Sequence, residues 1–166
     1  MALIGNLSTL QNLYEIVEIE NGYQFITETN IVYFIVFVSY PVLSDFFPTS
    51  IYMLNIDRYV PEDVRGHANN VRVRDTIIHI LDVFFTAHEE ALITICDVVD
   101  GKQYARKRLF DKWFDQFNEG RLCRIDAKCM VDESETYASL YFLKNSSCVD
   151  LLEDEFLKLA EVNFYN

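Results

Sequence analysis

The chain has 166 residues, half of them apolar, which is the usual size of one domain with a buried core. Its formal net charge of -12 opposes phosphate backbones, and its longest apolar run, Ile31 to Val38, is far shorter than a membrane-spanning helix. Because the N-terminus also lacks the basic segment of a secretion signal, we expect one cytoplasmic domain over residues 1–166, without a membrane or nucleic-acid partner.

The first third of the chain is rich in strand-forming residues. Leucine and isoleucine at helix-like spacing predict a short helix within residues 2–12, but from Tyr14 onward β-branched and aromatic residues dominate. Asn21-Gly22 predicts a hairpin, because both residues tolerate a positive φ. The expected strands lie near 13–20, 23–28, 31–39 and 51–57.

Two helices and a central strand follow. A helix is expected from near residue 70 to near His88, with one apolar face. The continuous apolar stretch Ala91 to Val98 is typical of a buried strand. Asp100-Gly101 then leads into a second helix near 102–118. The apolar face of the first helix is formed by Val73, Ile77, Ile80, Leu81 and Phe84, and that of the second by Ala105, Leu109, Phe110, Trp113, Phe114 and Phe117.

The chain closes with a hairpin and a helix. Strands are expected near 121–131 and 136–144, with the acidic residues Asp132 to Glu135 in the turn between them. A last helix runs to about residue 162, with Leu152, Phe156, Leu159 and Ala160 facing inward. The resulting order is β-β-β-β-α-β-α-β-β-α, which predicts an α+β fold with a single mixed, mainly antiparallel sheet.

A cluster of basic residues marks the second helix. Lys102, Arg106, Lys107, Arg108 and Lys112 are five of the fourteen basic residues. The helix N-terminus offers free N–H groups, and Arg72 and Arg74 open the other helix, so the two ends together would suit a phosphate group. The alternative is a solvated helix face, on which the basic side chains pair with Asp111 and Asp115.

Two carboxylates follow the buried strand, a frequent ligand position in sheets that carry helices. Asp97 and Asp100 are therefore weak candidates for a general base or for a contact with a partner's basic group. The alternative for Asp100 is that it caps the next helix. The four cysteines show no C-x-x-C spacing, so we expect no metal site and no disulfide.

The stretch Ile95 to Gln103, followed by the run Arg106 to Phe114 (RKRLFDKWF), resembles an uncharacterised bacterial family of small domain-of-unknown-function proteins. The similarity extends over most of residues 14–162 and implies no activity.

The element order is also similar to the later part of the acetyl-CoA-dependent N-acetyltransferase fold. That resemblance implies a pyrophosphate-binding loop at Arg65-Gly66, before the first long helix. It also places Asp100 near an asparagine of that superfamily, and Phe110 near the tyrosine that acts as general acid. Phe110 has no proton to donate, so the resemblance implies a degenerate coenzyme cleft.

Charge distribution favours a binding role. Residues 1–57 contain six acids and no Lys or Arg, and residues 129–166 contain eight acids and two bases. We therefore expect a non-catalytic binding or regulatory module that docks a basic protein partner, as an antitoxin, immunity or accessory protein does, and that has no cofactor. The alternative is an N-acyltransferase that uses a CoA thioester. In that case the coenzyme-binding candidates are Arg65, Gly66, Arg72, Arg74, Lys102 and Arg106.

Overall fold

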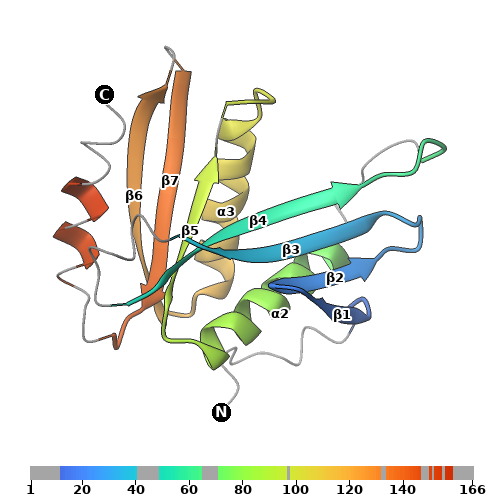
Figure 1. Ribbon diagram of the computed structural model, residues 1–166, viewed down its shortest axis with the longest axis horizontal. Coiled ribbons are helices and arrows are strands. Elements are labelled where there is room, and N and C mark those ends of the chain that lie inside the picture. Colours follow the sequence, from blue (N-terminus) through green and yellow to red (C-terminus); the bar gives the residue numbers. More distant parts are fainter. Residues whose placement is uncertain are drawn as a thin grey trace. The chain divides into compact units, whose positions relative to one another are not determined.

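A computed structural model shows seven strands in one mixed sheet, with the order β1-β2-β3-β4-β5-β7-β6 (Figure 1). β4 pairs parallel with β5, whereas β1–β2, β2–β3, β5–β7 and β6–β7 pair antiparallel. The strands are β1 (Ile16–Ile19), β2 (Gly22–Ile26), β3 (Val32–Ser39), β4 (Ile51–Tyr59), β5 (Ala91–Cys96), β6 (Leu122–Val131) and β7 (Ser134–Leu143), and the long helices are α2 (Val71–Ala87) and α3 (Gln103–Phe117).

The structure describes residues 12–40, 49–64, 71–96, 98–131, 134–146, 150, 152–154 and 156–158. A C-terminal helix follows β7 and is seen at its described residues between 150 and 158. The predicted α+β class and the predicted order of elements are confirmed. The helix expected within residues 2–12 lies outside the described residues, apart from the last position.

The chain divides into two compact units, of which the first comprises residues 1–38 and 54–88. Here α2 covers one side of β1–β3, and the ring of Phe84 stacks on Phe37 with 4.5 Å between the ring centroids. Phe25 and Ile35, on the same side of the sheet, are fully buried. Ile77 and Ile80 are buried on α2, as the apolar periodicity predicts.

The β1–β2 hairpin forms at the expected place but with a different turn. Ile19 pairs with Gly22, so the turn residues are Glu20 and Asn21, and Asn21 has a φ of 58°. Gly22 is the first residue of β2 rather than a turn residue. A Cβ at Gly22 would lie 2.1 Å from the carbonyl oxygen of Ile35, so this glycine is needed for the close approach of β2 and β3.

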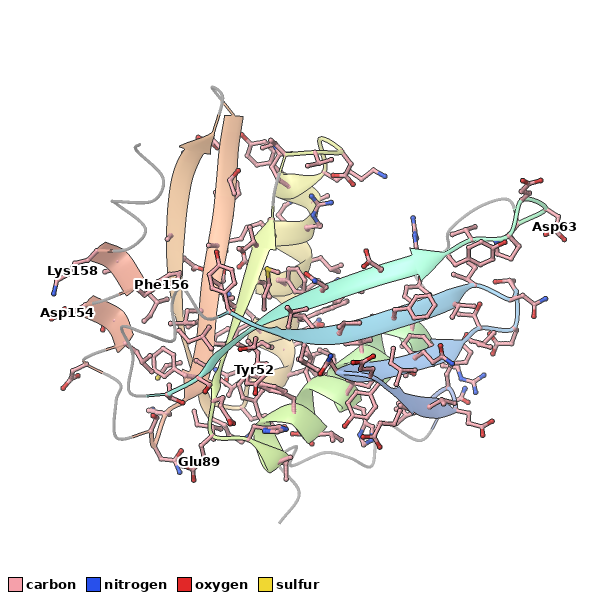
Figure 2. All side chains as sticks on the ribbon, viewed as in Figure 1. Tyr52, Asp63, Glu89, Asp154, Phe156 and Lys158 are labelled. Carbon is pink, nitrogen blue, oxygen red and sulfur yellow. The ribbon has the colours of Figure 1, made fainter. Side chains whose placement is uncertain are left out.

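The second unit comprises residues 39–53 and 89–166. The C-terminal helix packs Leu152 and Phe156 into a cluster with Ile93, Leu140 and other buried residues of β4–β7. Phe156 points toward the sheet, whereas Asp154 and Lys158 point away from it (Figure 2). The inward orientation predicted for Leu152 and Phe156 is thus confirmed, and Leu159 and Ala160 lie outside the described residues.

α3 lies against β5 and β7 but not with the stripe that its apolar residues predict. Ala105 and Leu109 are exposed, and the buried side chains are Gln103 and Trp113. The predicted stripe is therefore only partly right: Trp113 is buried and Phe110, Phe114 and Phe117 are half-buried, but Ala105 and Leu109 face solvent. Lys107 reaches Asp126 on β6 instead, so part of the helix face toward the sheet is polar.

The last hairpin also differs from the prediction. β6 and β7 pair up to Val131 and Ser134, so Ser134 and Glu135 belong to β7 and not to the turn. Among the described residues, no helix is long and apolar enough to cross a membrane.

Candidate functional site

The N-terminus of α3 carries three of the predicted site residues, and the structure brings them together. The Asp100 carboxylate accepts a hydrogen bond from the Lys102 N–H (3.1 Å) and one from the Arg106 guanidinium (2.8 Å). These two donors hold the pKa of Asp100 below its usual range, the backbone N–H being the larger cause. Asp100 thus accepts the N–H of the N-cap residue Lys102 but makes no side-chain cap bond to the first turn of α3.

The start of α2 holds Arg72 in a second closed cluster. Its guanidinium forms an ion pair with Glu28, donates to the Leu13 carbonyl at 3.0 Å and lies 4.0 Å above the Tyr14 ring centroid. Tyr14 also donates its hydroxyl to Glu28, and this hydrogen bond is the main cause that lowers the pKa of that carboxyl. Arg72 thus ties the start of the sheet to α2.

The remaining predicted residues either pair locally or lie outside the described residues. Arg74 forms an ion pair with its neighbour Asp75 at 2.7 Å. Arg65, Gly66 and Asp97 lie outside the described residues. Arg72 and Arg74 belong to the first unit, while Asp100, Lys102 and Arg106 belong to the second. The roles predicted for these residues stay predictions.

A larger polar network joins α3 to β6, and only one of its pairs was predictable from helical spacing. The Lys107 ammonium lies 2.5 Å from Asp111, as the i+4 spacing predicts, and 3.3 Å from Asp126 on β6. Arg124 lies 3.0 Å from Asp111 and 3.2 Å from Asp126. Ser139 on β7 donates a hydrogen bond of 2.6 Å to Asp126. The signal in the sequence was the period of two along Arg124, Asp126 and Lys128, which places all three on one side of a strand.

A fourth cluster surrounds Glu135 near the start of α3. Tyr104 and Tyr137 donate their hydroxyls to one oxygen of its carboxylate, at 2.8 and 2.6 Å, and Lys128 forms an ion pair with the other oxygen. Lys128 is the largest cause and the tyrosines are the next, and together they lower the pKa of Glu135 to about 2. The same carboxylate raises the pKa of both tyrosines, so all three groups keep their neutral-pH charge states.

The arginines named above share one property: each faces a carboxylate of the same chain. Arg72, Arg74, Arg106 and Arg124 are all engaged in this way. Many other carboxylates are exposed on the surface. Those of the first unit include Glu15, Glu18, Glu20, Asp57 and Asp63. Asp63 lies near the tip of the loop that follows β4 (Figure 2). These four arginines thus form ion pairs within the chain, whereas the named carboxylates of the first unit face solvent.

Comparison with known proteins identifies one family. Residues 69–158 match the model of a family of unknown function, DUF6169, over more than half of the chain. The expected membership in a family of unknown function is confirmed over that segment, whereas residues 14–68 lie outside the match. No curated protein and no solved structure matches the chain, so the acetyltransferase resemblance gains no support. On the evidence of this match, the chain belongs to the DUF6169 family of unknown function.

Proposed function

We propose that the protein is a non-catalytic binding or regulatory module that docks a basic protein partner, as an antitoxin, an immunity protein or an accessory subunit does. The observation that supports this proposal is the pairing of its arginines. Arg72 lies on Glu28 and Arg106 on Asp100, so two of the bases that would hold a coenzyme phosphate already have carboxylate partners. An anionic ligand would have to displace those carboxylates, whereas a cationic partner meets an acidic surface without such competition.

The acidic hairpin of the first unit supplies the sharpest test. Partner proteins are captured from a lysate on the immobilised protein and identified, and each is then titrated against the purified protein at several salt concentrations. We expect a partner with a basic surface whose affinity falls as salt rises. Replacing Glu15, Glu18 and Glu20 together by Gln should weaken binding, because the variant loses three exposed negative charges.

A matched control removes charge elsewhere. Glu89→Gln, Glu153→Gln and Asp154→Asn together neutralise three exposed carboxylates of the second unit and should leave the affinity unchanged. If the identified partner is acidic, or if salt and the hairpin variant leave its affinity unchanged, the proposal is wrong.

The N-acyltransferase alternative rests on the element order alone. It assigns phosphate binding to Arg65, Gly66, Arg72 and Lys102, and the general base to Asp97 or Asp100. A thermal-shift titration with acetyl-CoA and free CoA separates it from the docking module, since ligand at 100 times its dissociation constant stabilises by about 2.7 kcal/mol. A dose-dependent rise in the melting temperature would favour the enzyme, and the docking module predicts none.

A further inference from the structure

The side of β1–β3 that faces away from α2 is unusually apolar. Strand residues alternate between the two sides of a sheet, and Phe37 contacts α2, so Val32, Phe34, Val36 and Val38 of β3 lie on the opposite side. The pairings Ile26↔Val32 and Gln24↔Phe34 place alternate residues of β2 on that side. The pairing Val17↔Gln24 does the same for β1. We call this surface the outer face.

Exposure distinguishes the outer face from the α2 side. Val17, Ile26 and Val38 are 47%, 52% and 39% exposed, and Val32, Phe34 and Val36 are half-buried. Gln24 is the one polar side chain that the described strand pairings place here. An antiparallel sheet with one solvated side usually carries polar residues on that side. Contiguous exposed apolar side chains instead mark an interaction surface.

Charge limits what can cover the outer face. At its border lie the exposed carboxylates of Glu15, which precedes β1, and Glu20, in the β1–β2 turn, whereas Glu18 pairs with Tyr23 and so lies on the α2 side. No Lys or Arg occurs anywhere in residues 1–57, which contain β1, β2 and β3. A second copy of this chain would bring the same negative hairpin and a net charge of -12 to the contact. A partner with apolar side chains bordered by basic ones complements both the surface and its rim.

We propose that the outer face docks an amphipathic helix whose apolar stripe is flanked by Lys or Arg. A sheet that is apolar on both sides is completed by a layer of secondary structure on each, and a helix with one apolar stripe is a sufficient second layer. The flanking cations reach the hairpin carboxylates at the rim. This proposal rests on the proposed function and adds the place of contact and the form of the partner.

The test uses two synthetic peptides and the full-length protein. Both peptides form an 18-residue helix with the same leucine stripe, one bordered by Lys and the other by Glu. Backbone amide shifts of the protein are followed by NMR during titration with each peptide. We expect the Lys peptide to shift amides of Val17, Ile26 and Val38, and the Glu peptide to bind at least roughly tenfold more weakly.

Two charge-matched variants locate the contact. Ile26→Lys places a cation in the outer face and should weaken binding of the Lys peptide roughly tenfold or more. Val99→Lys makes the same change at a fully exposed apolar side chain of the second unit, 89% exposed, and should leave binding unchanged. Circular dichroism and melting temperature confirm that both variants fold.

The outcomes separate the two proposals. If the Lys peptide binds but Ile26→Lys and Val99→Lys affect it equally, the outer face is not the site, while a basic partner is retained. If both peptides bind the outer face equally well, the basic character of the partner is wrong, while the face is retained. If neither peptide binds, or if the protein is a dimer that Ile26→Lys dissociates, the outer face does not take a basic helix and the inference fails.

Discussion

Glu135 shows how strongly single contacts act on one side chain of this protein. Lys128 forms an ion pair with its carboxylate, and Tyr137 and Tyr104 donate hydrogen bonds to it. Together they lower its pKa from 4.5 to about 2. Because the folded-state pKa is below the unfolded one, the stabilisation is present above pH 4.5 and is lost as the pH falls toward 2. The residue is therefore a local source of acid sensitivity.

Replacing Glu135 by Gln should remove this dependence. We expect the variant to unfold more easily than the wild type at pH 6 and the difference to shrink steeply toward pH 2, where about half of the wild-type carboxyls are protonated. Chemical denaturation at a series of pH values measures it. Glu153→Gln, on an exposed helix position, is the control and should lower stability at neither pH. A constant difference between pH 6 and 2 would contradict the assignment.

Gly22 is the second residue whose replacement has a clear physical consequence. A Cβ there would lie 2.1 Å from the Ile35 oxygen and 2.9 Å from the Val36 Cα, and both of these atoms are backbone. Gly22→Ala should therefore destabilise the protein by about 2–4 kcal/mol, measured by urea denaturation.

Gly101 provides the matched control for Gly22. It has a φ of 68° and open space around it. Gly101→Ala should therefore lower the free energy of unfolding through backbone strain alone, by about 1 kcal/mol. Equal losses at the two glycines would show that the approach of β2 to β3 is not what requires Gly22.

At the scale of elements, the polar network beneath α3 is the feature that joins a helix to the sheet. Lys107→Met keeps the aliphatic stem but removes one of the two cations that Asp111 and Asp126 share, and Arg124 remains beside both carboxylates. The side chain of Lys107 is only 15% exposed, so we expect a loss of about 1–2 kcal/mol in the free energy of unfolding. Lys112→Met changes an exposed position of the same helix and should stay within about 0.5 kcal/mol. Thermal unfolding of both variants at neutral pH compares them.

Local patterns predicted most of the elements. The buried strand Ala91–Cys96 and the helix Val71–Ala87 follow from apolar runs and a 3.6-residue period, which are properties of neighbouring residues. The orientation of α3 could not be predicted in the same way. It depends on the polar surface made by Arg124 and Asp126, which only the pairing of β6 with β7 brings beneath the helix.

The candidate site was predictable in its residues but not in its contacts. The basic positions Arg72 and Arg106 are visible in the sequence, and so is the turn at Asp100. The partner of Arg72 is Glu28, which is 44 residues away and comes close only through the fold. The helical i,i+4 spacing finds pairs such as Lys107 with Asp111, whereas pairs that are distant in the sequence need the tertiary structure.

For the whole molecule, strand β4 serves both compact units. Its first residues, Ile51–Met53, pair with Ala91–Ile93 in the second unit, and Leu54 onward belongs to the first. The segment that matches the family, residues 69–158, therefore lacks the strand that borders β5.

A fragment of residues 69–158 should consequently fail to form a stable fold. The β5 edge, with Ala91, Leu92 and Ile93, would lose its backbone partners and expose side chains that are buried in the full chain. We expect aggregation or weak dispersion of amide signals in NMR for this fragment, and well-dispersed signals for the full chain under the same conditions. A well-folded 69–158 fragment would show that β5 needs no strand on that side.

The sharing of β4 also bears on how such a protein can be inherited and engineered. Each unit is assembled from two separate stretches of chain, so no single cut releases either one, and a recombination breakpoint near residue 69 splits both at once. The segment of residues 69–158 therefore cannot be transferred to another protein by itself. A graft of this protein into another chain has to carry the strands before α2 as well, and a protease that cleaves the connection between β4 and α2 leaves both products dependent on each other.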